Sequence, residues 1–166
     1  KKWSFLSSPH IDAMVGHSID ELNFWLPFTN SYGTNALRCT DLDSGIVVLR
    51  ELCQDFDFNL ETFTEEGRGL LEKKMMAEEE FFSLVDDNCR SIEMKVGELL
   101  MFDPRCVHGT AENVEKHTRI SMDFRLFPTH LYEKQTYTHQ TKKTGRKLIK
   151  GDVFFEKSAF EILEET

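Results

Sequence analysis

The 166-residue sequence lacks the features that mark several familiar classes of protein. Its four cysteines include no C-x-x-C pair, which excludes a zinc site built on that motif. No stretch approaches the run of roughly 18 apolar residues that a membrane-spanning helix needs. The first residues lack the apolar region of a secretory signal peptide. We therefore expect a cytoplasmic protein whose cysteines are reduced thiols, with no membrane as a partner.

Positive charge is also scarce, because 20 Lys and Arg stand against 29 Asp and Glu, for a net charge of −9. An acidic surface repels phosphate backbones, so we expect no nucleic acid as a partner. Hydrophobic residues make up 40% of the chain, which is enough to fill a core at this length. We expect a single domain over residues 1–166, and the sequence leaves its oligomeric state open.

Short apolar segments separated by turn residues dominate the chain. They predict strands over residues 22–28, 35–40, 46–49, 91–95, 98–102, 107–109 and 118–127, with a turn at 41–45. Apolar residues at helical spacing predict one clear helix over 69–85, and a short terminal helix is expected over 158–164. Many short strands around a single helix favour a sandwich or barrel.

The triplet His10-Ile11-Asp12 is the first candidate for chemistry. Residues two apart on a strand point to the same side, so the imidazole and the carboxylate are expected to reach one ion. His108 follows the segment Gly97–Asp103, which is predicted to be a glycine turn and a buried strand. Two imidazoles and one carboxylate with open positions suit non-haem Fe(II).

Arg119 is the second candidate, eleven residues after His108. It alternates with Ser121 on the polar face of a strand whose other face is apolar. A guanidinium inside the protein needs an anionic partner, because an unpaired buried charge is costly. A dicarboxylate co-substrate would supply this partner, and a salt bridge to Asp123 on the same face is the alternative.

Two stretches resemble the core of Fe(II)- and 2-oxoglutarate-dependent oxygenases. The first contains H-I-D at 10–12, D-E-L-N-F-W-L-P-F-T at 20–29 and G-T-N at 33–35. The second contains G-E-L-L-M-F at 97–102, H-G at 108–109, N at 113 and T-R-I-S at 118–121. Within this superfamily the chain is most similar to Kdo hydroxylases, to oxygenases of sporadic carbohydrate-biosynthesis clusters, and to hydroxylases and halogenases of free amino acids.

The resemblance implies a mainly β fold, a double-stranded β-helix (jelly-roll, cupin-like) with one helix inserted between the two halves of the core. It covers residues 8–127. Members usually carry further elements upstream of the first ligand, and only nine residues precede His10 here. We therefore expect this domain to lack some upstream elements of the family.

The resemblance also implies a role for each candidate residue. The iron ligands are His10, Asp12 and His108, which are thus the catalytic residues. Arg119 holds the distal carboxylate of 2-oxoglutarate, with Ser121 and Asn23 also in the cofactor-binding site.

The implied activity consumes molecular oxygen and 2-oxoglutarate, hydroxylates a small polar metabolite, and releases succinate and CO2. The metabolite is expected to be a sugar, a sugar nucleotide or a free amino acid. Related halogenases have a small residue in place of the carboxylate, so Asp12 favours hydroxylation. The alternatives are a non-catalytic metal- or ligand-binding jelly-roll module and a cupin-type enzyme that does not use 2-oxoglutarate.

Overall fold

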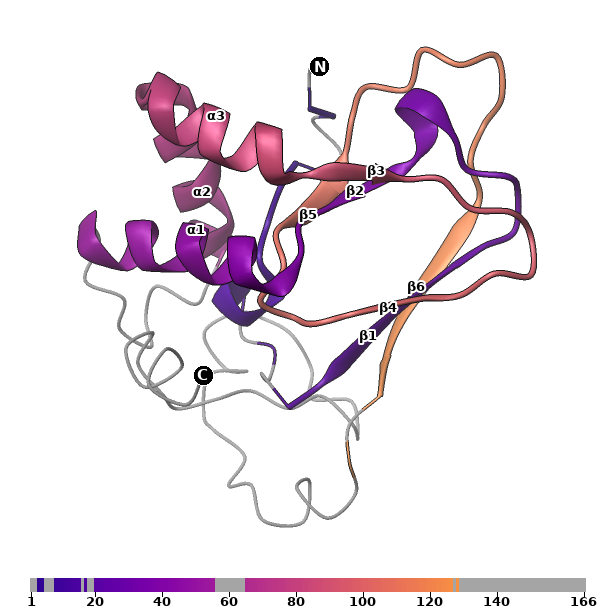
Figure 1. The fold of residues 1–166 in the computed structure, drawn as a ribbon, viewed down its shortest axis with the longest axis horizontal. Helices are drawn as coiled ribbons and strands as arrows, with labels where there is room; N and C mark the ends of the chain where they lie inside the picture. The colour runs from indigo at the N-terminus through magenta and orange to yellow at the C-terminus, as the bar shows by residue number, and fades with distance from the viewer. Residues whose placement is uncertain are drawn as a thin grey trace.

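The fold is that of a computed structural model, which describes residues 3–4, 8–15, 17, 20–55, 65–126 and 128. Six strands form two small antiparallel sheets, with the orders β4-β1-β6 and β3-β2-β5 (Figure 1). The strands are β1 (Leu22–Pro27), β2 (Leu37–Cys39), β3 (Arg90–Ile92), β4 (Leu100–Phe102), β5 (His108–Thr110) and β6 (Ser121–Leu126). These six were predicted, and most are shorter than predicted.

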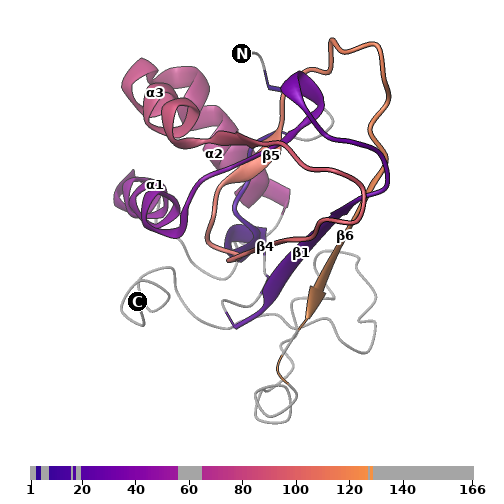
Figure 2. The ribbon, with the colours of Figure 1, turned by 45° about the vertical axis from the view of Figure 1, so that its right-hand side comes forward.

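The described part of the chain also contains three α-helices, α1 (Leu42–Asp55), α2 (Glu65–Ala77) and α3 (Glu79–Asn88). They are grouped on one side of the sheets in both views of the ribbon (Figures 1 and 2). The structure is therefore mixed, and the expectation of a mainly β chain with one inserted helix is only partly met. The short helix predicted over 158–164 lies outside the described residues.

Helix α1 replaces the turn and the strand that were predicted over residues 41–49, so that prediction is wrong. The Oδ1 atom of Asp41 accepts a hydrogen bond from the backbone N–H of Ser44 at 2.8 Å, which is an N-cap interaction. Val48, Leu49 and Leu52 are all buried. Their spacing places them on one helical face, and packing of that face outweighs the strand propensity of the β-branched run.

The single helix predicted over 69–85 is divided in two at Glu78, whose backbone is extended (φ −130°, ψ 111°). The break allows α2 and α3 to pack against each other and to bury residues in the same core. That core comprises Ile11, Ala13, Met14, Val48, Leu49, Leu52, Leu71, Met75, Phe81, Val85, Cys89 and Val107. A smaller cluster joins the two sheets, with Trp25 of β1, Leu37 of β2 and Met94.

The two faces of the β4-β1-β6 sheet differ sharply in composition. On β1, Asn23, Trp25 and Pro27 are buried, and the residues between them are not. Six apolar side chains, 41–59% exposed, lie on or beside the outer face: Leu22, Phe28, Met101, Ile120, Met122 and Leu126. The predicted alternation is therefore present along β6, and its polar positions share the face of Asn23 and Trp25, where Arg125 is half-buried and Asp123 is exposed.

Within the described residues, no helix has both the length and the apolar composition that a membrane crossing requires. The thiols of Cys39, Cys89 and Cys106 are free and buried. The side chain of Cys53 lies outside the described part of the chain.

At Gly45, helix α1 packs closely against the backbone of Arg105 and Cys106. A Cβ atom there would lie 2.4 Å from the backbone oxygen of Arg105. We expect Gly45→Ala to destabilise the protein by about 1–3 kcal/mol, because backbone atoms must move to admit the methyl group. Urea unfolding would measure this change.

Gly69 provides the matched control, because it lies in helix α2 with no atom within 4 Å of an added Cβ. Gly69→Ala should leave stability unchanged or raise it by about 0.5–1 kcal/mol, the usual helix preference for alanine. Equal effects at the two positions would contradict the close packing of α1.

Candidate metal centre

Two histidines are brought face to face by backbone pairing. His108 lies on β5, and His10 forms an isolated antiparallel bridge with it. The two residues exchange both backbone hydrogen bonds, each 2.9 Å long. Directly opposed residues in such a pair project to the same side, and the two imidazole centroids are 4.2 Å apart. The pairing thus joins positions that are far apart in the sequence.

Hydrogen bonds also fix which nitrogen of each ring is available. The Nδ1 atom of His10 lies 2.9 Å from the carbonyl oxygen of Ser8, and that of His108 lies 3.1 Å from the carbonyl oxygen of Cys106. A carbonyl oxygen only accepts, so each Nδ1 carries the proton. In the neutral ring this leaves the Nε2 lone pair for a metal, an arrangement typical of histidine ligands.

Asp12 reaches the two imidazoles by a route that differs from the predicted one. It does not continue a strand after His10, but begins a short 3-10 helix, Asp12–Val15. The backbone N–H of Ala13 donates to Pro104, which anchors this helix to the turn that precedes His108. The prediction of a shared strand face is therefore wrong, although the carboxylate does reach both histidines.

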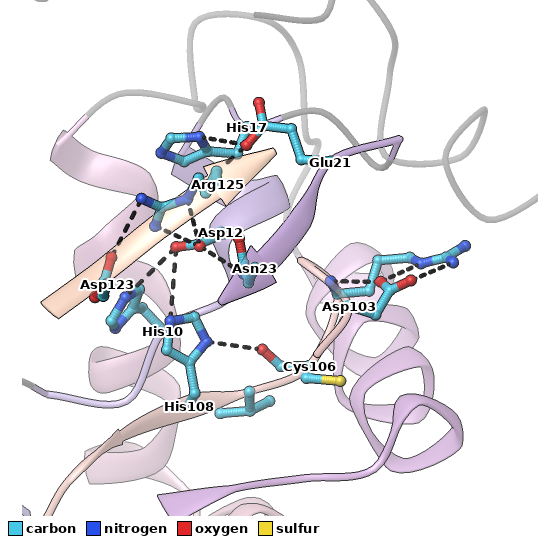
Figure 3. A network of polar contacts seen from close by, with 12 residues as sticks. His10, Asp12, His17, Glu21, Asn23, Asp103, Cys106, His108, Asp123 and Arg125 are labelled. Carbon is cyan, nitrogen blue, oxygen red and sulfur yellow. Dashed lines mark hydrogen bonds and ion pairs between the residues drawn. The ribbon is translucent and has the colours of Figure 1, made fainter. Parts of the chain in front are cut away.

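The two oxygens of the Asp12 carboxylate have different surroundings (Figure 3). Oδ1 lies 3.6 Å from Nε2 of His10 and 3.7 Å from Nε2 of His108. It is buried and has no hydrogen-bond partner among the described residues. Oδ2 accepts hydrogen bonds from Nδ2 of Asn23 at 2.9 Å and from Arg125, at 3.1 Å from Nε and 2.6 Å from Nη2.

The electrostatic environment keeps Asp12 ionised. Burial by itself would raise the pKa of this carboxyl, since only 1% of its side chain is exposed. The charges of His108 and Arg125 outweigh burial and hold the pKa well below its usual range. Asp12 is therefore a carboxylate at neutral pH.

These three residues form a group whose ligand atoms all lie within 4.8 Å of one another. The set contains two imidazole nitrogens and one carboxylate oxygen, and the buried Oδ1 has no hydrogen-bond partner in the described structure. The residues fit a divalent transition metal, for which this donor set is typical. Sequence analysis predicted these three residues, and the fold brings them together.

Arg119 lies apart from this group and contacts different residues. Its Nη1 atom donates to the backbone oxygen of Asn35 at 2.8 Å, and its guanidinium lies 5.3 Å from the centre of the Trp25 ring. Burial lowers its pKa. Among the described residues it forms no salt bridge, so the alternative of a pair with Asp123 is not what the structure has; Asp123 lies 3.5 Å from Arg125 instead.

The region around Arg119 holds a second buried donor. The Nδ2 atom of Asn35 has no hydrogen-bond partner in the described part of the chain. Trp25, below the guanidinium, is the next inward position on β1 after Asn23, which contacts Asp12. Inward positions on a strand are about 7 Å apart, so β1 links the surroundings of Asp12 to those of Arg119.

The other two predicted cofactor-binding residues occupy distinct places. Asn23 is buried and donates to Asp12, so it lies beside the candidate ligands. Ser121 begins β6, half-buried, and pairs in register with Pro27 of β1.

Arg125 was not among the candidate residues of the sequence analysis, although it shares the strand face of Arg119 and Ser121. The register that pairs Asn23 with Arg125 brings both residues to Asp12. A second inward arginine on the predicted strand was the available signal.

Comparisons of the chain with protein-family models, with curated proteins and with solved structures find no match.

The ligand assignment can be tested by metal binding. We expect His10→Ala and His108→Ala each to abolish tight Fe(II) binding under anaerobic conditions, because each removes one of three donors. Isothermal titration calorimetry would measure the affinity. His117→Ala is the control, since its exposed ring contacts Tyr32 and lies outside the group. A variant of His108 that keeps wild-type affinity would contradict the assignment.

Proposed function

We propose that this protein is an Fe(II)- and 2-oxoglutarate-dependent oxygenase that hydroxylates a small polar metabolite. The observation that carries the proposal is the buried Oδ1 atom of Asp12. It lacks a hydrogen-bond partner among the described residues and faces the Nε2 atoms of His10 and His108. Leaving a buried carboxylate oxygen unpaired is costly, and a metal ion at this position would remove that cost.

His10, Asp12 and His108 would hold the iron, and three coordination positions would stay open for co-substrate and oxygen. When bound, the iron supplies the oxidative chemistry, in which 2-oxoglutarate is converted to succinate and CO2. The residues of the chain fix the ligand atoms and exclude water. His10 is the most exposed of the three, at 20% of its side chain, so we place the approach to the centre on its side.

Arg119 would bind the distal carboxylate of 2-oxoglutarate. Its guanidinium is desolvated and forms no salt bridge with a described residue, which suits an anionic ligand. The unpartnered Nδ2 of Asn35 would be a further donor nearby. In this proposal the two antiparallel sheets belong to a jelly-roll core. Trp25 would lie between the iron and Arg119, beneath the bound 2-oxoglutarate.

The substrate class is proposed from the polar groups around Asp12. His17 and Glu21 form a pair at 3.1 Å, Arg125 lies 3.8 Å from Glu21, and Asp123 lies 3.5 Å from Arg125. These polar and charged groups suit a ligand that carries hydroxyl or amino groups, such as a sugar, a sugar nucleotide or a free amino acid.

A non-catalytic metal-binding module is the second candidate. Arg125 favours this candidate, because its permanent positive charge already compensates Asp12 without any ion. The two candidates differ in a direct assay, since only the oxygenase forms succinate from 2-oxoglutarate in the presence of Fe(II) and oxygen.

Binding of 2-oxoglutarate can be tested without knowledge of the substrate. We expect the wild-type protein to develop the visible charge-transfer band of an Fe(II)–2-oxoglutarate complex when it is titrated anaerobically with both. Arg119→Met should weaken 2-oxoglutarate binding roughly 10- to 100-fold, since a charge-assisted hydrogen bond contributes about 1.5–3 kcal/mol. Fe(II) affinity should stay at the wild-type value.

Arg90→Met is the control for that experiment, because Arg90 is exposed on β3 of the other sheet. Fe(II) binding without the band would remove 2-oxoglutarate from the proposal and favour the binding module. A band that forms equally well in Arg119→Met would show that another residue binds the distal carboxylate.

A further inference from the structure

Arg125 donates two hydrogen bonds to Asp12, one of the candidate metal ligands. It lies on β6 directly opposite Asn23 of β1, and both donate to the same oxygen of Asp12. Side chains of directly opposed residues are about 5 Å apart at Cβ, which allows both to converge on one atom. Oδ2 thus receives three N–H groups, two from the guanidinium and one from the amide.

Three donors fill the hydrogen-bonding capacity of a carboxylate oxygen. The other oxygen, Oδ1, receives none from the described residues, although it is equally buried. A carboxylate that is free to turn binds metals through one oxygen or through both. Here rotation about the Cβ–Cγ bond would break all three hydrogen bonds to Oδ2, so the side chain is held with one oxygen directed to the histidines.

Arg125 is itself held from both sides. Its Nη1 lies 3.5 Å from Asp123, and its Nε lies 3.8 Å from Oε2 of Glu21, the oxygen that contacts His17 (Figure 3). Glu21 is buried, and 28% of the Arg125 side chain is exposed. The guanidinium therefore has a defined position and does not depend on Asp12 alone for its orientation.

Charge alone does not account for an arginine at this position. A permanent positive charge this close to a ligand opposes the binding of a divalent cation. Hydrogen bonding to Oδ2 favours metal binding instead. It fixes the orientation of the carboxylate, so that Oδ1 is directed to the metal position. The two effects can be separated by experiment, since one changes affinity and the other changes the number of oxygens bound.

From these contacts we infer that Arg125, together with Asn23, is a positioning residue that restricts Asp12 to binding the metal through Oδ1 alone. The inference rests on the proposed metal centre and does not depend on 2-oxoglutarate. Its consequence is that one coordination position, which a two-oxygen aspartate would occupy, is kept open for exogenous ligands.

The test uses Mn(II) as the probe and counts the water molecules bound to it by water-proton relaxation. Arg125→Met should allow Asp12 to bind through both oxygens, so bound Mn(II) should carry one water fewer than in the wild type. Mn(II) affinity should rise, because a repelling charge is lost and a donor is gained. Arg125→Lys keeps the charge and one donor group, and should retain the wild-type number of waters.

Arg119→Met is the matched control, because it removes a guanidinium from the segment just before β6, where Arg119 contacts Asn35 and Trp25 and not Asp12. It should leave both the hydration number and the Mn(II) affinity unchanged. An unchanged hydration number in a folded, metal-loaded Arg125→Met protein would overturn the inference, even if the affinity rose. Failure of the wild type to bind Mn(II) would instead overturn the metal centre itself.

A measurement on the wild type covers the case in which Arg125→Met does not fold. With carboxyl-labelled aspartate, the infrared difference between metal-loaded and metal-free protein isolates the stretches of the ligand carboxylate. We expect the wide separation between antisymmetric and symmetric stretches that one-oxygen binding produces. A narrow separation, typical of two-oxygen binding, would overturn the inference without any substitution.

Discussion

The buried negative charge of Asp12 is the constraint on which the arrangement of the two sheets depends. An isolated carboxylate in the protein interior costs several kcal/mol, so it must be met by donors from elsewhere in the chain. Those donors come from β1 and β6 of one sheet, and the histidines that face its other oxygen are paired at the edge of the second sheet. One side chain thus connects elements that the backbone hydrogen bonds leave separate.

The rigidity of the candidate ligands has a simple origin in the core. Asp12 lies between Ile11 and Ala13, and His108 follows Val107, and these three apolar residues belong to the cluster that the helices bury. Displacement of a ligand would therefore disturb core packing, which is dense and yields little. Helices α1, α2 and α3 contribute no ligand, but they hold the two ligand segments in place.

Much of the fold was predictable where a single local signal dominated. Along residues 118–127 the period-two alternation was enough to predict a strand and its inward face. At residues 46–49 two local signals competed, since the β-branched run favours a strand while Asp41 and the spacing to Leu52 favour a helix. Burial of Val48, Leu49 and Leu52 against the core decided the outcome, and burial is not a local property. The break between α2 and α3 at Glu78 likewise depends on packing in the core and not on a local sequence signal.

The sequence by itself determined the chemistry that is available: two imidazoles, one carboxylate and an inward arginine in an order that suits one metal centre. It also determined that Asn23 and Trp25 share a face, because strand geometry fixes alternation. Only the tertiary structure decided which arginine meets Asp12. Register pairs Asn23 with Arg125, whereas Arg119 lies with Trp25 and Asn35. Register and bridge pairing arise from contacts between distant segments, so no local pattern in the chain could have assigned those partners.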